Sequence, residues 1–228
     1  MLKYSKDGKV SFDSEKHIYT RLEDGKILKG VTGLISSYKN PFDKDTIAEK
    51  YCAKHGLVKE DVLEEWDMKG KVSRNQGTVI HKIFEDFIMT GKIVKPCIYN
   101  NEIQAERFIK DFFLKGRLIP VEAEMIIYNE SIASQIDFIA KTPEGDHFIF
   151  DPKTNKEIEK NSYGKMMLPP FSHIPDASFY HYSIQVSIYK KICKGYDIKQ
   201  CFIIHINDTG YDIIKPEIIN IPNSVINF

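Results

Sequence analysis

The sequence lacks the features that mark several common classes of protein. Its 228 residues include only four cysteines and one tryptophan, and no two cysteines form a Cys-x-x-Cys pair, so a zinc ribbon is not expected. No apolar run approaches the roughly 20 residues of a membrane-spanning helix. The first residues carry positive charge with no apolar stretch behind it, unlike a secretory signal. We therefore expect a cytoplasmic protein with no membrane partner.

The formal net charge is zero, because 32 lysines and arginines balance 32 aspartates and glutamates. A strongly basic chain would have indicated a nucleic-acid partner. The balance does not exclude one, because carboxylates that bind a metal offset a local basic groove in the total. The 42% of apolar residues is ordinary for a globular chain with a substantial core. The length suits one domain with elaborations.

The pattern of apolar residues predicts a mixed α/β (or α+β) protein. Strand patterns cover a hairpin over 9–36 and strands over about 121–128, 132–141, 147–154 and 201–206. Helical periodicity covers 44–70, 78–90, 102–115 and 179–194, with Gly77 directly before the second helix. We expect residues 156–177 to be irregular. The order predicts a central mixed sheet flanked by helices, with a core over residues 73–228 and an N-terminal hairpin and helical elaboration over residues 1–72.

The third of these strands contains Asp151-Pro152-Lys153. Because side chains alternate along a strand, Asp151 and Lys153 lie on the same face. The carboxylate can bind a hard divalent cation, and the ammonium can orient water or stabilise charge at a phosphate. A surface ion pair is the plainer interpretation of these two residues alone. Pro152 weakens it, because a proline in a strand removes a ladder hydrogen bond.

Asp137 lies on the preceding strand among apolar neighbours, where an unpaired carboxylate is costly. A connection of three or five residues between the strands places Asp137 opposite Asp151 on one face of the sheet. A connection of four residues places them on opposite faces. A shared site requires the first arrangement.

Asp137 followed by Asp151-x-Lys153 resembles the motif of the PD-(D/E)XK nuclease superfamily. Three further segments resemble its RecB-like exonuclease branch, namely Gly77-Thr78-Val79-Ile80-His81, the strand that carries Glu124, and Gln185-Val186-Ser187-Ile188-Tyr189. Gly30-Val31-Thr32 resembles the opening of phage-encoded members. The chain departs from the branch at Ile136, where proline is usual, and at Ser134, where glycine is usual.

The resemblance implies a restriction-endonuclease-like core and a site that binds one or two Mg²⁺ or Mn²⁺ ions. The implied metal ligands are His81, Asp137, Asp151 and the backbone carbonyl of Pro152. The histidine nitrogen favours Mn²⁺. Lys153 would orient or activate the attacking water, beside Asp137, Asp151 and Glu124 as catalytic residues. No iron–sulfur cluster is expected, because the cysteine positions do not fit those of cluster-bearing relatives.

Four further residues have open roles. Glu122 lies two residues from Glu124 on the same predicted face and is an alternative to it. Glu85 lies one helical turn after His81 and is either its outer partner or a solvated acid. Gln185 and Tyr189 would contact DNA or brace the site.

The leading hypothesis is a DNA exonuclease in recombination, repair or phage DNA processing, in a bacterial or phage-infected cytoplasm. Its substrate would be DNA with a free end, and a recombination protein is one conceivable partner. The alternatives are a structure-specific endonuclease on the same fold and a DNA-binding module without catalysis. The aromatic and basic residues between 161 and 179 suggest a segment that guides the substrate.

Overall fold

Nine strands among residues 2–227, the part of the chain that the computed structural model describes, join in one mixed sheet. They are β1 (Leu2–Tyr4), β2 (Val10–Asp13), β3 (Ile18–Arg21), β4 (Ile27–Gly30), β5 (Ile119–Tyr128), β6 (Ile132–Lys141), β7 (His147–Lys153), β8 (Ile198–Ile206) and β9 (Tyr211–Ile214). The order is β1-β2-β3-β4-β6-β7-β8-β9, and β5 pairs with the other edge of β6. The predicted mixed sheet flanked by helices is therefore confirmed.

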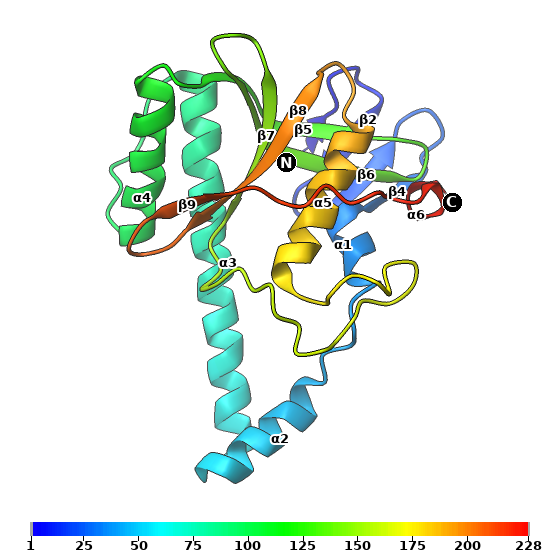
Figure 1. The fold of residues 1–228 in the computed structure, drawn as a ribbon, viewed down its shortest axis with the longest axis vertical. Coiled ribbons are helices and arrows are strands. Elements are labelled where there is room, and N and C mark those ends of the chain that lie inside the picture. Colours follow the sequence, from blue (N-terminus) through cyan, green and yellow to red (C-terminus); the bar gives the residue numbers. More distant parts are fainter. Residues whose placement is uncertain (1, 228) are drawn as a thin grey trace.

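Helices cover both faces of this sheet (Figure 1). They are α1 (Val31–Ser36), α2 (Lys44–His55), α3 (Lys59–Thr90), α4 (Asn100–Ile109) with its π-helical continuation η1 (Lys110–Leu114), α5 (Ser178–Ile192) and α6 (Asn223–Ile226). One core cluster joins α3 and α4 to the sheet, and another joins α1 and α5 to it. No helix among residues 2–227 combines the length and the apolar content needed to cross a bilayer.

The alternation of side chains on β6 supplies both cores. Phe138 packs with Phe84 of α3 and Phe150 of β7, at ring-centroid distances of 5.2 and 5.1 Å. Its neighbour Ile139 faces the other core, with Ile184 of α5. Full burial of each such side chain contributes about 1.5–3 kcal/mol. The two helical layers are thus fixed against β6 and β7, the strands that carry both candidate aspartates.

The prediction of helices over 44–70 and 78–90 is wrong, because the break comes at Gly56. Gly56 has a φ of 67° and ends α2 through a hydrogen bond from its N–H to Cys52 O. The next helix, α3, runs unbroken through Gly70 and Gly77. A glycine inside a helix costs only about 1 kcal/mol relative to alanine, which the surrounding helix formers offset. The boundary predicted between residues 72 and 73 falls inside α3.

The N-terminal and C-terminal ends differ from the predicted pattern in smaller ways. The predicted hairpin over 9–36 is a set of three strands, with β1 added outside it, and Val31 begins a helix instead of continuing a strand. The short elements β9 and α6 carry no pattern long enough to predict them. Helix α5 ends at Ile192, before the predicted Lys194, with Cys193 extended. The strands β5 to β8 begin and end within three residues of the prediction.

Residues 37–79 form an arm that leaves the body after α1 and returns where Ile80 enters the core (Figure 1). Within the arm, α2 packs on α3 through the rings of Tyr51 and Trp66, 5.9 Å apart, and through an ion pair of 2.6 Å between Lys44 and Asp67. All six residues from 71 to 76 are exposed, so the rest of the protein covers little of this part of α3.

Candidate active site

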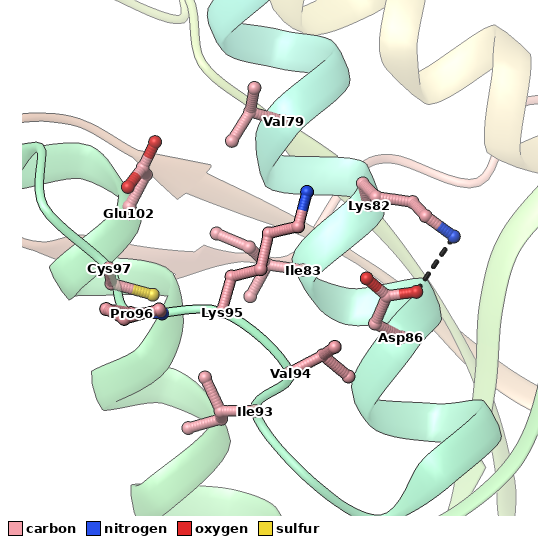
Figure 2. A pocket seen from close by; sticks show the side chains of 10 residues that line it. All are labelled: Val79, Lys82, Ile83, Asp86, Ile93, Val94, Lys95, Pro96, Cys97 and Glu102. Carbon is pink, nitrogen blue, oxygen red and sulfur yellow. Dashed lines mark ion pairs between the residues drawn. The ribbon is translucent and has the colours of Figure 1, made fainter.

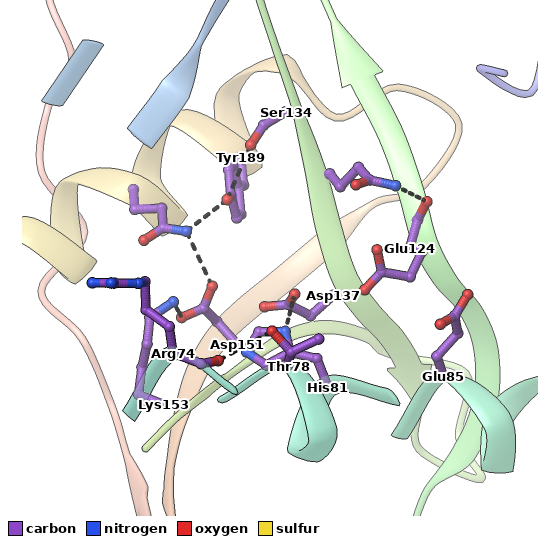
Figure 3. Close-up of polar contacts among 12 residues, drawn as sticks. Arg74, Thr78, His81, Glu85, Glu124, Ser134, Asp137, Asp151, Lys153 and Tyr189 are labelled. Atoms are coloured by element: carbon purple, nitrogen blue, oxygen red, sulfur yellow. Dashed lines mark hydrogen bonds and ion pairs between the residues drawn. The ribbon is translucent and has the colours of Figure 1, made fainter. Parts of the chain in front are cut away.

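The hairpin of β6 and β7 brings the two aspartates together. Lys141 pairs with His147, so five residues connect the strands, and the pairing continues to Phe138 opposite Phe150. Asp137 and Asp151 occupy the next position of the same register. The required arrangement of the two acids is therefore confirmed. Both lie in the sheet between α3 and α5 (Figure 3).

Asp151 is almost fully buried and is held from two sides. Its Oδ2 lies 2.6 Å from Lys153 Nζ, and Gln185 Nε2 donates to its Oδ1 at 3.2 Å. Burial raises the pKa of Asp151 to about 6, although Lys153 opposes the rise. Burial lowers the pKa of Lys153, but the carboxylates of Asp151 and Asp137 outweigh it and raise that pKa above its ordinary value. Lys153 is therefore an ammonium at neutral pH.

Helix α3 brings His81 to the second aspartate, with 2.8 Å between His81 Nδ1 and Asp137 Oδ1. Burial disfavours the charged imidazole, but the Asp137 carboxylate outweighs burial and raises the pKa of His81 to about 9. Burial alone would raise the pKa of Asp137, and the His81 cation lowers it instead. The two side chains form a charged pair at neutral pH.

These residues offer donors that fit a hard divalent cation. Ligand atoms of His81, Glu124 and Asp137 lie within 4.8 Å of one another. Asp151 Oδ2 is buried and, apart from the ion pair to Lys153, has no hydrogen-bond partner among the described residues. One nitrogen and several carboxylate oxygens suit Mn²⁺ or Mg²⁺. The cluster could hold such an ion.

The structure separates the two candidate glutamates of β5. Glu124 joins the cluster, with a backbone φ of 50° and its carbonyl accepting a hydrogen bond of 3.3 Å from Gln135 Nε2. Glu122 instead pairs with Lys6 and Tyr196, away from the cluster. The two glutamates thus have different surroundings, and the left-handed backbone of Glu124 interrupts the regular alternation between them.

Glu85 is not the partner of His81. Its carboxylate contacts Lys3 Nζ at 3.3 Å and Lys82 Nζ at 3.1 Å, whereas His81 bonds to Asp137. The spacing of one turn places Glu85 on the same side of α3 as His81 but directs it toward the N-terminal strand.

Gln185 and Tyr189 brace the site from α5. Gln185 Nε2 also donates to the hydroxyl of Tyr189 at 2.6 Å, and Ser134 Oγ donates to the same hydroxyl at 3.1 Å. Tyr189 is 3% exposed, so it is not a surface for DNA. Ser134, one of the two departures from the motif pattern, therefore has a hydrogen-bond partner in Tyr189.

The cluster opens onto a pocket of about 460 Å³ between α3 and the end of β7. Its lining residues are Ser73, Arg74, Gly77, His81, Pro152, Lys153, Thr154, Asn155 and Lys156. A Cβ on Gly77 would lie 3.4 Å from Thr154 Oγ1, at the short end of ordinary van der Waals contact, so α3 passes close to the end of β7 here. A second pocket of about 390 Å³ shares four of these residues and continues to the turn after β8. Arg74 carried no motif signal, and only the fold places it here.

A smaller apolar pocket of about 160 Å³ lies on the other side of α3, between Val79, Ile83 and the segment 93–97 (Figure 2). Two of its four charged side chains, Lys82 and Asp86, pair with each other at 2.8 Å. None of His81, Asp137 and Asp151 lines this pocket, whereas His81 lines the polar pocket.

The segment 154–177 is irregular, as predicted, and is tied to the body. Asp176 accepts hydrogen bonds from Asn40 N at 2.8 Å and from Asn40 Nδ2 at 2.7 Å, which joins the segment to the arm. Met167, Phe171 and Phe179 are buried, so they anchor the segment and are not free to stack on bases. Tyr163 is 84% exposed.

In metal-free protein, thermal stability is expected to fall as the pH rises from 6.5 to 9. The folded-state pKa of His81, about 9, lies above its ordinary 6.5, so its stabilisation is complete below 6.5 and is lost as the pH rises through 9. The pKa of Asp151 is raised to about 6, so this residue also makes the protein less stable as the pH rises, but at lower pH than His81. Melting in EDTA across this range tests the prediction. His81→Asn should flatten the curve, and His173→Asn, an exposed control, should not. A flat wild-type curve would contradict it.

No protein-family model matches the chain, and a search of curated proteins gives no match. The functional argument therefore depends on the geometry of the site.

Proposed function

We propose that this chain is a divalent-metal-dependent DNA exonuclease with a restriction-endonuclease-like core. The observation that carries the proposal is the meeting of Asp137, Asp151, Lys153 and His81 in one partly buried cluster that opens onto a polar pocket. An ordinary surface ion pair does not explain it, because Asp151 is 1% exposed and its charge is costly there without a function.

The ion would be held by His81, Asp137, Asp151 and Glu124, with the backbone carbonyl of Pro152 as a further donor. A bound Mg²⁺ or Mn²⁺ polarises a phosphate oxygen and lowers the pKa of water. Lys153 contributes from the protein side. Because it is an ammonium at neutral pH, it donates hydrogen bonds that orient the attacking water and stabilise charge on the phosphate, and it is not a general base.

The surroundings of the cluster support a nucleic-acid strand as the substrate. Arg74, Lys153 and Lys156 line the pocket, and such cations contact backbone phosphates without reading sequence. The hydroxyls and amides that line both pockets can contact phosphate and sugar as well.

The arm favours a substrate with a free end. It is a closed stretch of chain, anchored in the core at Ile35 and at Ile80, and its α3 leg forms one wall of the pocket through Ser73 and Arg74. The hydrogen bonds between Asn40 and Asp176 join its other leg to the segment 154–177. A strand that passed between the two legs would have to enter by its end, because a closed circle could not pass this connection.

With Mn²⁺ or Mg²⁺, wild-type protein is expected to release mononucleotides or short fragments from end-labelled linear DNA and to leave covalently closed circles intact. EDTA should abolish the activity. Single- and double-stranded substrates, labelled at either end, would give the strand preference and the polarity. Cutting of closed circles would instead establish the endonuclease. DNA binding with no cleavage under any condition would establish the binding module.

We further propose that the activity serves recombination, repair or phage DNA processing in a bacterial or infected cytoplasm, with a recombination protein as its partner. The preference for a free end is what supports these settings. A test is whether the activity on linear DNA produces a tail on which an annealing protein can assemble.

A further inference from the structure

A lysine of the N-terminal strand reaches the acidic side of the active site. Lys3 Nζ lies 3.3 Å from Glu85 Oε1 and 3.5 Å from Glu124 Oε2. The three side chains are 33%, 24% and 20% exposed, so their charges are partly shielded from water. Figure 3 shows Glu85 beside Glu124, next to the cluster of Asp137 and His81. Strand β1 therefore contributes a charge to a site otherwise built from residues far along the chain.

Centres of this chemistry that use two ions hold them about 3.5–4 Å apart, so the second ion needs a group of oxygen ligands beside those of the first. Glu85 is a carboxylate outside the group of His81, Glu124 and Asp137, and it shares the Lys3 ammonium with Glu124 of that group. Lys3 Nζ already lies between these two carboxylates. An ammonium there neutralises them and keeps a second divalent cation away by repulsion.

We infer that Lys3 supplies the second positive charge of a centre that binds a single divalent ion. The inference depends on the proposed metal site and specifies how many ions it holds. Lys3 acts through Glu85 and Glu124, and is thus a positioning residue.

The two glutamates would stay in place without Lys3. Glu124 is fixed by its left-handed backbone, at a φ of 50°, and by the hydrogen bond from Gln135 to its carbonyl. A non-glycine residue keeps this conformation only where its surroundings determine it. Glu85 is held by Lys82 at 3.1 Å as well. Removal of the Lys3 charge would therefore leave two preformed carboxylates beside the first ion.

The number of Mn²⁺ ions bound per chain, measured by electron paramagnetic resonance without DNA, tests the inference. Wild type should bind one ion, and Lys3→Met, which keeps an apolar stem, should bind two. Lys3→Arg keeps the charge and should bind one. Lys6→Met is the matched control, because Lys6 lies on the same N-terminal segment but pairs with Glu122, outside the cluster. It should also bind one.

Two ions in wild type would overturn the inference, and so would one ion of unchanged affinity in Lys3→Met. Either result leaves the proposed nuclease standing. No bound Mn²⁺ in wild type would reject the metal site itself, and the inference with it. Because Lys3 is partly exposed on an edge strand, circular dichroism should show all four proteins folded. If Lys3→Met is unfolded, Lys3→Gln replaces it, with two ions again expected.

Discussion

Replacement of Lys153 by methionine is expected to lower the nuclease rate about 10²–10⁴-fold, the range found when a positioned charge at a reacting phosphate or acyl group is removed. The methionine keeps most of the apolar stem and removes the ammonium, whose Nζ lies 4.9 Å from the centroid of the Tyr182 ring. What is lost is the ammonium 2.6 Å from Asp151. Cleavage of end-labelled linear DNA under single-turnover conditions measures the loss.

The matched control for this variant is Lys156→Met. Lys156 lines the same pocket but is exposed and lies outside the cluster. It should weaken binding of DNA and leave the rate at saturating DNA nearly unchanged. Equal losses in both variants would mean that Lys153 acts only as one more cation for the phosphate backbone, and the proposed catalytic role would be rejected.

The sequence predicts those parts of the site that depend on the alternation of side chains along a strand. Asp151 and Lys153 share a face because they are two positions apart, and Asp137 joins them because five residues connect β6 and β7. The sequence does not decide whether the connection between the two strands has four residues or has three or five. The hydrogen-bond register of β6 and β7 shows five. Alternation of this kind is local, so it can be read from a single sequence.

The parts that could not be predicted depend on contacts between distant segments. Lys3 and Glu124 meet across 121 positions, and no pattern near either residue announces the contact. The choice of Glu124 over Glu122 depends on one left-handed residue, which costs energy and therefore runs against local preference.

Helix boundaries failed for a related reason. Because Gly77 precedes an apolar stripe, the sequence predicts that a helix begins directly after it. In the structure, α3 continues through Gly77. Gly77 lies inside the helix, near Thr154 at the end of β7. Gly56 and Gly91, each with a positive φ, end α2 and α3. Residue type alone does not separate these two uses.

Replacement of Asp151 by asparagine is expected to separate metal binding from folding. The substitution keeps the shape of the side chain and an oxygen that can accept from Gln185, at 3.2 Å in the wild type. It removes the ion pair with Lys153 and, with it, the cost of a carboxylate whose pKa burial raises to about 6. Loss of the ion pair lowers the stability of the folded protein, and removal of the buried carboxylate raises it, so the two effects oppose each other. The melting temperature in EDTA should therefore change by only a few degrees, while the nuclease rate falls about 10³-fold or more.

Addition of Mn²⁺ tests for the loss of metal binding in Asp151→Asn without any DNA. At a hundred times its Kd, a bound ion stabilises the folded protein by about 2.7 kcal/mol, which for a chain of this size raises the melting temperature by about 5–10 °C. Wild type should show this rise and Asp151→Asn should lose most of it, whereas Asp208→Asn, an exposed acid in the adjoining pocket, should keep it. A full rise in Asp151→Asn would show that the ion is held by His81, Glu124 and Asp137 without Asp151. The pairing of Asp151 with Lys153 would then be the whole of its role.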